Sequence, residues 1–180
     1  MQKTIVKTLA LMMCFIAIAF TSCKPDPQPE PEPTPANAIF LGTYEGSIYL
    51  NGTATAPELI AMGIASLPID SMEFVLRADI SAGSNDQSVD VVFSISDENY
   101  ETTGTVNDMQ VNFGTLSYTY VENSTTFKVD LDLTGLLGNT KNQLTLTGPF
   151  TGTGIVTMDN YPVALTLTTS GTVSGTLIKE

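Results

Sequence analysis

Apolar and polar residues alternate along most of the chain after residue 40, which is the pattern of β-strands with one buried face. The clearest case follows Ser124, where large apolar residues take every second position and polar or charged residues lie between them. Segments near residues 44–50, 72–80 and 89–95 share the pattern. The inward positions predicted in this way are Tyr44, Ile48, Leu50, Phe74, Leu76, Ala78, Ile80, Val89, Val91, Phe93, Ile95, Phe127, Val129, Leu131 and Leu133.

More strands are predicted between these segments and towards the C-terminus. They fall at about residues 100–106, 110–121, 143–150, 154–158, 163–169 and 172–178, and Gly, Asn and Asp turns separate them. The second of them is expected to bend at Gly114, since a glycine inside a strand often marks a bulge or a barrel corner. The fold class is therefore all-β, an antiparallel meander of about eight to ten strands.

The two ends of this strand series carry similar motifs. Residues 42–46 (GTYEG) resemble residues 171–175 (GTVSG), with glycines at equal spacing. Small residues at matched positions would let the first and last strands pack side by side, which favours a closed barrel without exposed edges. An open sandwich is the alternative, because Gly-Thr pairs are common elsewhere in the chain.

Residues 56–67 depart from the alternation and predict a short helix. Thr55 is a candidate N-cap, Pro57 stands at an early helical position, and Glu58 lies in the first turn. The helix should be interrupted at Gly63. Because Glu58 is its only charged residue, we expect most of its circumference to be covered and the helix to cap one end of the barrel as a lid or plug.

Residues 1–22 have the pattern of an export signal. Lys3 and Lys7 precede an apolar run, Leu9–Phe20, that is shorter than the roughly 20 residues a membrane span needs. The signal ends at Cys23 in the manner of a bacterial lipoprotein. We therefore expect cleavage before Cys23, acylation of its thiol with palmitate or a similar chain, and attachment to membrane lipid. An ordinary secretory signal peptide is the alternative.

A proline-rich linker and a single domain follow. Residues 23–38 form the linker, in which proline occupies every second position from 25 to 35 and favours an extended polyproline II conformation. At about 3.1 Å per residue, this stretch makes a stalk of roughly 35 Å. Residues 39–180 then form one β-barrel domain.

The residue types of this domain exclude several kinds of site. The chain has no histidine, and its two cysteines are Cys14 and Cys23. A Ser-His-Asp triad, a thiolate nucleophile and a metal held by cysteine or histidine are therefore excluded. Asp130 and Asp132 share one face of a predicted strand, and an exposed alternation explains them better than a calcium or glycosidase site. We predict no catalytic residue, no metal and no cofactor.

The chain is acidic, with 19 Asp and Glu against 7 Lys and Arg and a formal net charge of −12. Loss of Lys3 and Lys7 with the signal would leave five basic residues. Phosphate backbones bind clusters of basic side chains, so nucleic acid is excluded as a partner. We interpret the charge as a source of solubility and mutual repulsion.

The opening of the first strand, Gly42-Thr43-Tyr44, resembles the Gly-x-Trp motif that begins lipocalins. With the lipoprotein signal, the linker and the predicted barrel, it is similar to calycin-like and lipocalin-like outer-membrane lipoproteins of Bacteroidetes, which often begin with a Gly-Thr-Tyr-x-Gly strand. The chain departs from lipocalins in having Tyr for Trp, and in lacking an arginine on the last strand to pack over that ring. The resemblance implies a shared fold more than a shared ligand.

The resemblance also implies a location and a modification. It places the protein at the outer membrane, on the periplasmic face or the cell surface. In that group, acidic residues after the lipidated cysteine direct surface export, and Asp26, Glu30 and Glu32 fit this role loosely. Asp70-Ser71-Met72 matches the group's short O-glycosylation pattern, which makes Ser71 a candidate acceptor.

A ligand cavity under the helix is the sharpest functional hypothesis. Helix residues would line its mouth and strand residues its interior, namely Leu59, Ile60, Met62, Ile64 and Leu67, with Tyr44, Phe74, Phe93 and Phe127. The alternative is a filled barrel, since eight strands leave room only for side chains or one small ligand. We expect a membrane-anchored, non-catalytic protein that binds a small apolar ligand or an envelope partner. A structural, adhesive or glycan-system accessory subunit is the alternative, and a carboxylate-dependent enzyme comes third.

Overall fold

The computed structural model describes residues 34–180, apart from residues 97, 123–124 and 157–163. Cys23, the signal segment and most of the linker lie outside the described residues. In chain order the elements are η1 (Ala36–Ile39), β1 (Gly42–Thr55), α2 (Pro57–Ala61), β2 (Leu67–Ala82), β3 (Ser88–Ile95), β4 (Glu98–Asn107), β5 (Gln110–Glu122), β6 (Thr125–Leu137), β7 (Gln143–Val156) and β8 (Leu165–Lys179).

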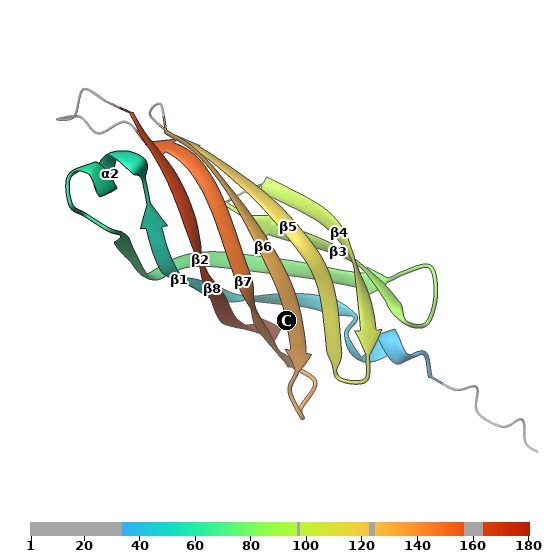
Figure 1. The fold of residues 1–180 in the computed structure, drawn as a ribbon. Coiled ribbons are helices and arrows are strands. Elements are labelled where there is room, and N and C mark those ends of the chain that lie inside the picture. The colour runs from blue at the N-terminus through green and yellow to red at the C-terminus, as the bar shows by residue number, and fades with distance from the viewer. Residues whose placement is uncertain (1–33, 97, 123–124, 157–163) are drawn as a thin grey trace, which may run out of the picture. The chain divides into compact units, whose positions relative to one another are not determined.

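The eight strands form a closed antiparallel barrel (Figure 1). Each strand pairs with its neighbours in sequence, and β8 pairs with β1. The predicted all-β class, antiparallel meander and closed barrel are therefore confirmed. The predicted breaks near residues 152 and 171 do not occur, so β7 and β8 each continue as one long strand.

Two residues that commonly disturb strands lie at irregularities of this sheet. Pro149 is tolerated inside β7 because it lies where the pairing of β7 with β6 is interrupted. Gly114 has a φ of +68° at the register shift between β5 and β6, which confirms the predicted bend. Both positions let long strands curve around the barrel without ending.

The inward positions predicted from the alternation form the core. All of them are buried, except that Phe74 and Phe127 are half-buried and pack against it. Aromatic rings pack against one another in this core: those of Phe93 and Phe113 meet edge to face with 5.2 Å between their centroids. The sequence pattern thus identified the core face of β1, β2, β3 and β6 correctly.

The segment that leads into β1 closes one end of the barrel, which we call the filled end. Phe40, next to η1, is fully buried in the core, and Asn37 is buried as well. The Asn37 side-chain amide donates hydrogen bonds to the carbonyl oxygens of Asn85 and Ser88, at 3.1 and 2.8 Å. Its backbone N–H donates to the carbonyl oxygen of Asp86 at 2.9 Å. These bonds satisfy a buried polar side chain and fix η1 to the turn between β2 and β3.

The first and last strands close the ring through twelve residue pairs, from Tyr44↔Lys179 to Thr55↔Thr168. Glycines allow this close approach: a Cβ atom at Gly175 would lie 2.3 Å from the carbonyl oxygen of Ser47. Gly52 and Gly171 pair directly with each other, and a Cβ on either would overlap the facing backbone. The predicted side-by-side packing of the two strands is confirmed.

A basic residue of the last strand packs over the Tyr44 ring. The Lys179 Nζ atom lies 5.6 Å from the ring centroid and donates a hydrogen bond to the carbonyl oxygen of Leu41. Gly42 leaves room for this side chain, because a Cβ there would lie 2.5 Å from the Lys179 Cε atom. A lysine of the last strand thus covers the aromatic ring of the first strand where the barrel closes.

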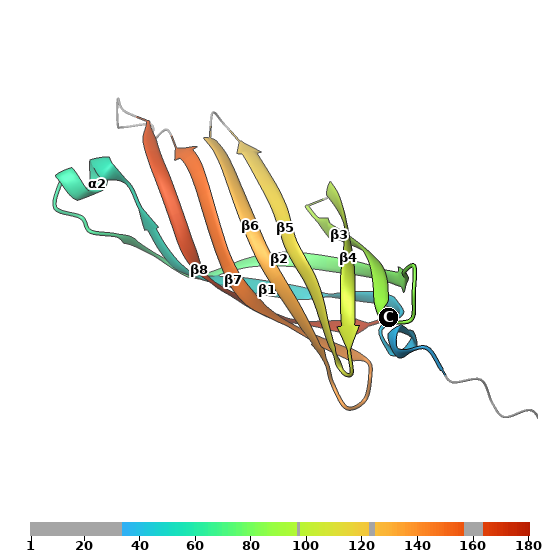
Figure 2. The ribbon, with the colours of Figure 1, turned by 45° about the vertical axis from the view of Figure 1, so that its right-hand side comes forward.

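The ring of strands is complete only in the half of the barrel near the filled end. The pairing of β3 with β2 ends at Leu76↔Ile95, so no described strand covers that edge of residues 67–75 of β2. The pairing of β4 with β5 covers three residue pairs, Thr105–Asn107 with Gln110–Asn112. Beyond them β4 diverges from β5 (Figure 2). Two strand edges are thus left unpaired in the other half of the barrel.

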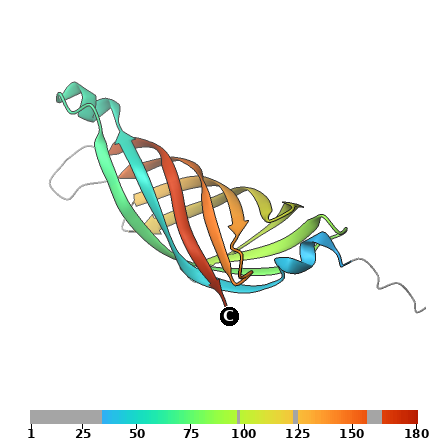
Figure 3. The same ribbon diagram turned by 90° about the horizontal axis from the view of Figure 1, so that it is seen from below.

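The predicted helix is shorter and more exposed than expected. Figure 3 shows α2 at the end of the domain opposite η1, which we call the open end. The helix has five residues, and the chain leaves it through Gly63, which has a φ of +83°. Its N-cap is Ala56 and not Thr55. Only Leu59 of the helix is buried, whereas Ile60 is 59% exposed, so the expectation of a covered plug is wrong.

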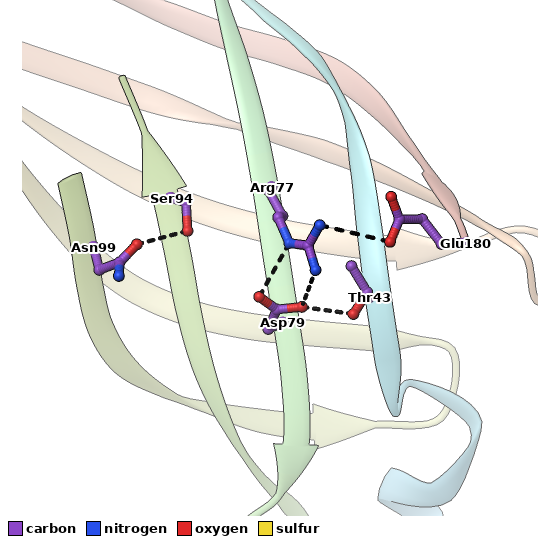
Figure 4. A network of polar contacts seen from close by, with 6 residues as sticks. All are labelled: Thr43, Arg77, Asp79, Ser94, Asn99 and Glu180. Atoms are coloured by element: carbon purple, nitrogen blue, oxygen red, sulfur yellow. Dashed lines mark hydrogen bonds and ion pairs between the residues drawn. The ribbon is translucent and has the colours of Figure 1, made fainter. Parts of the chain in front are cut away.

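A polar network on the outer surface links β1, β2 and the C-terminal residue (Figure 4). Thr43 donates to the Asp79 carboxylate at 2.6 Å, and Arg77 forms ion pairs with Asp79 at 3.2 Å and with Glu180 at 3.6 Å. The hydrogen bonds from Thr43 and Arg77 lower the pKa of Asp79. These side chains are largely exposed, so the network contributes little to stability. On the neighbouring strands, Ser94 donates to Asn99 at 2.8 Å.

We predict that Tyr44→Phe stabilises the domain by about 1 kcal/mol. The Tyr44 hydroxyl is buried and has no hydrogen-bond partner among the described residues, and burial raises its pKa. Removing the oxygen therefore removes a desolvation cost and keeps the ring. Urea unfolding measures the change. Tyr49→Phe on the outer face of the same strand is the control, because it removes a hydroxyl that bonds to Glu73 and should not stabilise the domain. A clear loss of stability in Tyr44→Phe alone would show that the hydroxyl has a partner.

Candidate functional site

A cavity of about 470 Å³ lies inside the half of the barrel near the open end. Strands β1, β2, β5, β6, β7 and β8 contribute its walls, and thirteen residues line it. Eleven of them are apolar: Leu50, Ala54, Ile69, Met72, Phe74, Tyr118, Phe127, Val129, Phe150, Val156 and Leu167, with Tyr118 counted by its ring. The other two are Glu73 and Thr169. A small pocket lined by Ile48, Leu50, Phe74, Ile95, Tyr118, Val129 and Leu131 shares four of its residues with this cavity.

The cavity exists because glycines line the inner face of the wall. On β7, a Cβ atom at Gly152 would lie 3.1 Å from the Phe127 ring, and one at Gly154 would lie 2.2 Å from it. The ring therefore lies against the backbone of β7 and leaves the centre of the barrel empty. Gly171 on β8 accommodates Phe150 in the same way, with 2.7 Å between its Cβ position and the ring. In this half of the barrel the large side chains thus lie along the wall and do not fill the centre.

Thr169 is the one buried polar side chain of the cavity wall. It is 3% exposed, and its hydroxyl oxygen has no hydrogen-bond partner among the described residues. Its neighbours across the strands are Ala54 on β1 and Gly152 on β7, both without a large side chain. Glu73, in contrast, is exposed and accepts a hydrogen bond from the Tyr49 hydroxyl at 3.2 Å.

Three aromatic rings bridge the region where β4 and β5 separate. Tyr118 meets Phe74 and Tyr100 edge to face, with centroid distances of 6.2 and 5.9 Å. Tyr100 donates a hydrogen bond to Glu98, and burial together with this bond raises the pKa of Tyr100 to about 12. The Thr102 hydroxyl donates to the carbonyl oxygen of Phe113 at 3.1 Å. Side chains thus replace the missing strand pairing.

The structure separates the residues that the sequence grouped as one cavity. Phe74 and Phe127 line the cavity. Tyr44 and Phe93 are buried in the core of the barrel instead. The expectation that the helix forms the mouth is wrong, because none of its residues is among those that line the cavity.

The residues that the sequence predicted at the cavity mouth fall into two groups. Leu59 packs in a second small cluster with Ala56 and Leu165, and Leu67 lies against it. The other three, Ile60, Met62 and Ile64, are 59%, 46% and 40% exposed. The helix ends at Ala61, Gly63 adopts the left-handed conformation, and β2 begins at Leu67. Residues 60–64 therefore stay exposed at the surface.

The site residues missed in the sequence are small ones. Ala54 and Thr169 face inward by the same period-two rule that identified the large residues. Thr169 and Gly171 on this face of β8, and Ala54 and Gly152 on the neighbouring strands, are small residues beside the cavity. Large apolar residues therefore indicate the packed half of the barrel, whereas small residues indicate the half that contains the cavity.

The remaining candidates lie on the surface. Asp130 accepts a hydrogen bond from Ser117 and an ion pair from Lys128 at 3.1 Å, which lower its pKa. Together with exposed Asp132, it lies on the outer face, as expected. Ser71 is exposed, has a φ of 52°, and donates its backbone N–H to the Asn51 side chain at 2.9 Å.

Two kinds of feature are absent from the described residues. Across residues 34–180, outside the gaps given above, no group of three or more His, Cys, Asp or Glu side chains is arranged to hold a metal ion. In the same residues, no helix has the length and apolar character needed to cross a bilayer.

No protein-family model and no curated protein matches the sequence.

Proposed function

We propose that the protein is a lipid-anchored, non-catalytic binding protein of the outer membrane, on the periplasmic face or the cell surface, whose barrel takes up a small apolar molecule. The cavity is the observation that carries this proposal. Its volume of about 470 Å³ is in the range of small-molecule sites, and eleven of its thirteen lining residues are apolar. Transfer of apolar surface from water into such a cavity is favourable in proportion to the area buried.

The course of the chain supports a tethered binding protein. The linker enters the domain at Thr34, next to η1, and η1 closes the filled end. The cavity lies in the other half of the barrel, lined by residues near the far ends of β1 and β7. The first described residue, Thr34, therefore lies at the filled end, in the half of the barrel that does not contain the cavity.

The resemblance to calycin-like lipoproteins agrees with this proposal. Gly42 and Tyr44 stand where that group has its first-strand motif, and Lys179 covers the ring from the last strand. In this arrangement the motif belongs to the filled end and stabilises the fold. The ligand, in contrast, would depend on residues that the motif does not include.

A structural or adhesive accessory subunit is the second candidate, and one observation favours it. Residues 114–121 of β5 have an edge that β4 does not cover, and they include neither a charged residue nor a proline that would discourage pairing with another strand. The edge of β2, in contrast, contains Pro68, Asp70 and Glu73. The side chains of Tyr100 and Thr102 lie against the β5 edge, which argues for the binding function. Protection of the β5 amides from hydrogen exchange in an assembly isolated from cells would reverse this preference.

The anchor is tested by Cys23→Ser, with Cys14→Ser as the matched control. We expect Cys23→Ser to abolish incorporation of labelled palmitate and to move the protein from the membrane fraction to the soluble fraction, because one serine cannot carry the acyl chains. Cys14→Ser lies within the signal segment and should change neither result. A Cys23→Ser protein that remained labelled and membrane-bound would contradict the proposed anchor.

Uptake of an apolar molecule is tested with diphenylhexatriene, a hydrocarbon that fluoresces only outside water. The mature chain with Cys23→Ser is used, so that no acyl chain of its own competes. We expect saturable binding, and a loss of affinity of about tenfold or more in Leu167→Trp, because the larger side chain occupies the cavity.

Thr168→Trp is the control for this experiment. Thr168 is the next residue of β8 and is exposed on the outer face, so the same substitution there should leave the affinity unchanged. Circular dichroism shows whether both variants are folded. Absence of binding by the folded parent chain, or equal loss in both variants, would contradict the proposal.

A further inference from the structure

We infer that the cavity opens sideways, between β2 and β5, and that it binds a single-chain amphiphile by its hydrocarbon chain while the head group stays outside in water. This inference rests on the proposed binding function and adds the route of entry and the chemical class of the ligand. Three observations carry it: the residues of β2 that line the cavity, the unpaired edges of β2 and β5, and the side chains that lie between these edges.

The lining residues of β2 indicate that the cavity reaches the outer surface at this strand. Register places Met72 opposite the buried Leu50 and therefore on the inner face, yet Met72 is 50% exposed. Glu73 lies on the outer face opposite Tyr49, which donates a hydrogen bond to it, yet Glu73 lines the cavity. An exposed inward residue next to an outward residue that lines the cavity is expected where the cavity continues around a free strand edge.

The other walls of the cavity contribute residues from one face of each strand. On β1, β6, β7 and β8 the lining residues are separated by an even number of positions, so they share the inner face. On β2, in contrast, the three consecutive residues 72–74 line the cavity. The opening therefore lies at β2.

The unpaired edges of β2 and β5 border this opening. Residues 67–75 of β2 do not pair with β3, and residues 114–121 of β5 do not pair with β4. The Tyr118 ring on β5 meets the Phe74 ring on β2 with 6.2 Å between centroids, and Tyr100 of β4 packs against Tyr118. Paired backbones form the rest of the wall up to the open end. Side chains rotate without breaking the sheet, so a narrow hydrocarbon chain can pass between these rings.

The position of the opening determines which part of a ligand enters. Eleven of the thirteen lining residues are apolar, so a hydrocarbon chain gains free energy in proportion to the area it buries there. The Thr169 hydroxyl is buried within the wall beside Gly152, and the one charged lining residue, Glu73, lies on the outer face. A head group inside the cavity would lose its hydration without gaining a hydrogen bond, so it is more stable at the opening.

The ligand class is tested by competition against diphenylhexatriene, with residues 23–180 carrying Cys23→Ser. Dodecyl maltoside, kept below its critical micelle concentration, is compared with dodecanol, which has the same chain and a small head group. We expect the maltoside to displace the probe at no more than about fivefold the concentration of dodecanol, because the chain supplies the binding free energy. A larger difference, or no displacement by the maltoside, would overturn the inference. Failure of the parent chain to bind the probe would instead overturn the proposed function itself.

The route is tested by thiol protection in the same chain, which contains no other thiol because Cys14 and Cys23 are the only cysteines of the sequence. Glu73→Cys places a thiol at the proposed opening, and Ile155→Cys places one on the exposed outer face of β7 near the open end. We expect bound dodecyl maltoside to slow the reaction of Glu73→Cys with a maleimide by about fivefold or more, because the head group covers the thiol. The rate for Ile155→Cys should not change.

Val75→Cys is a second position at the same edge, since Val75 is 62% exposed and does not line the cavity. It replaces Glu73→Cys if that variant does not bind the probe, and the same protection is expected. Protection of Ile155→Cys, or no protection at the β2 edge in a variant that binds the probe, would overturn the lateral route.

Discussion

The pairing of β1 with β8 closes the barrel, and both halves of the interior are enclosed only because of it. It joins segments more than a hundred residues apart in the chain through twelve residue pairs, and it turns a meander into a ring. Glycines on both strands make the close approach possible, because side chains at Gly175 or Gly52 would overlap the facing backbone. Tyr44 and Lys179 occupy the last pair of this seam, where the aromatic ring, the ammonium group and the Leu41 carbonyl meet.

Closure at that seam divides the interior into two unequal halves. Near the filled end all eight strands surround the core, and Phe40 and Asn37 complete it. Towards the open end β3 and β4 are too short to continue the wall, and glycines on β7 and β8 let aromatic rings lie against the backbone. One half of the barrel can therefore be packed for stability, while the other half keeps a space of about 470 Å³. The proposed binding function uses this second half.

The sequence predicted the fold better than it predicted the site, and the reason is physical. The alternation of large apolar residues reports which face of a strand is buried, so the core around Phe93 and Leu131 was identified correctly. The same signal reports nothing about where packing is incomplete. The volume of the cavity depends on small residues such as Ala54 and Gly152. It also depends on how far β3 extends along β2, which the register between the two strands determines.

The prediction for the helix was wrong for a similar reason. Its apolar composition suggested a covered plug, yet a five-residue helix that ends near Gly63 cannot turn its side chains over the barrel. The contact of Lys179 with the Tyr44 ring depends in the same way on the pairing of two strands that are distant in the sequence. In both cases the local sequence was compatible with two arrangements, and contacts between distant strands selected one of them.

The proposed function requires an interior that is filled at one end and open to a ligand at the other. Methyl NMR of the mature chain with Cys23→Ser, recorded during titration with diphenylhexatriene, tests this requirement. We expect shifts for methyl groups of the cavity wall, at Leu50, Val129 and Leu167, and none for those of the filled end, at Val89, Leu144 and Leu177. Shifts spread equally over both sets, or confined to the exposed residues of α2, would contradict it.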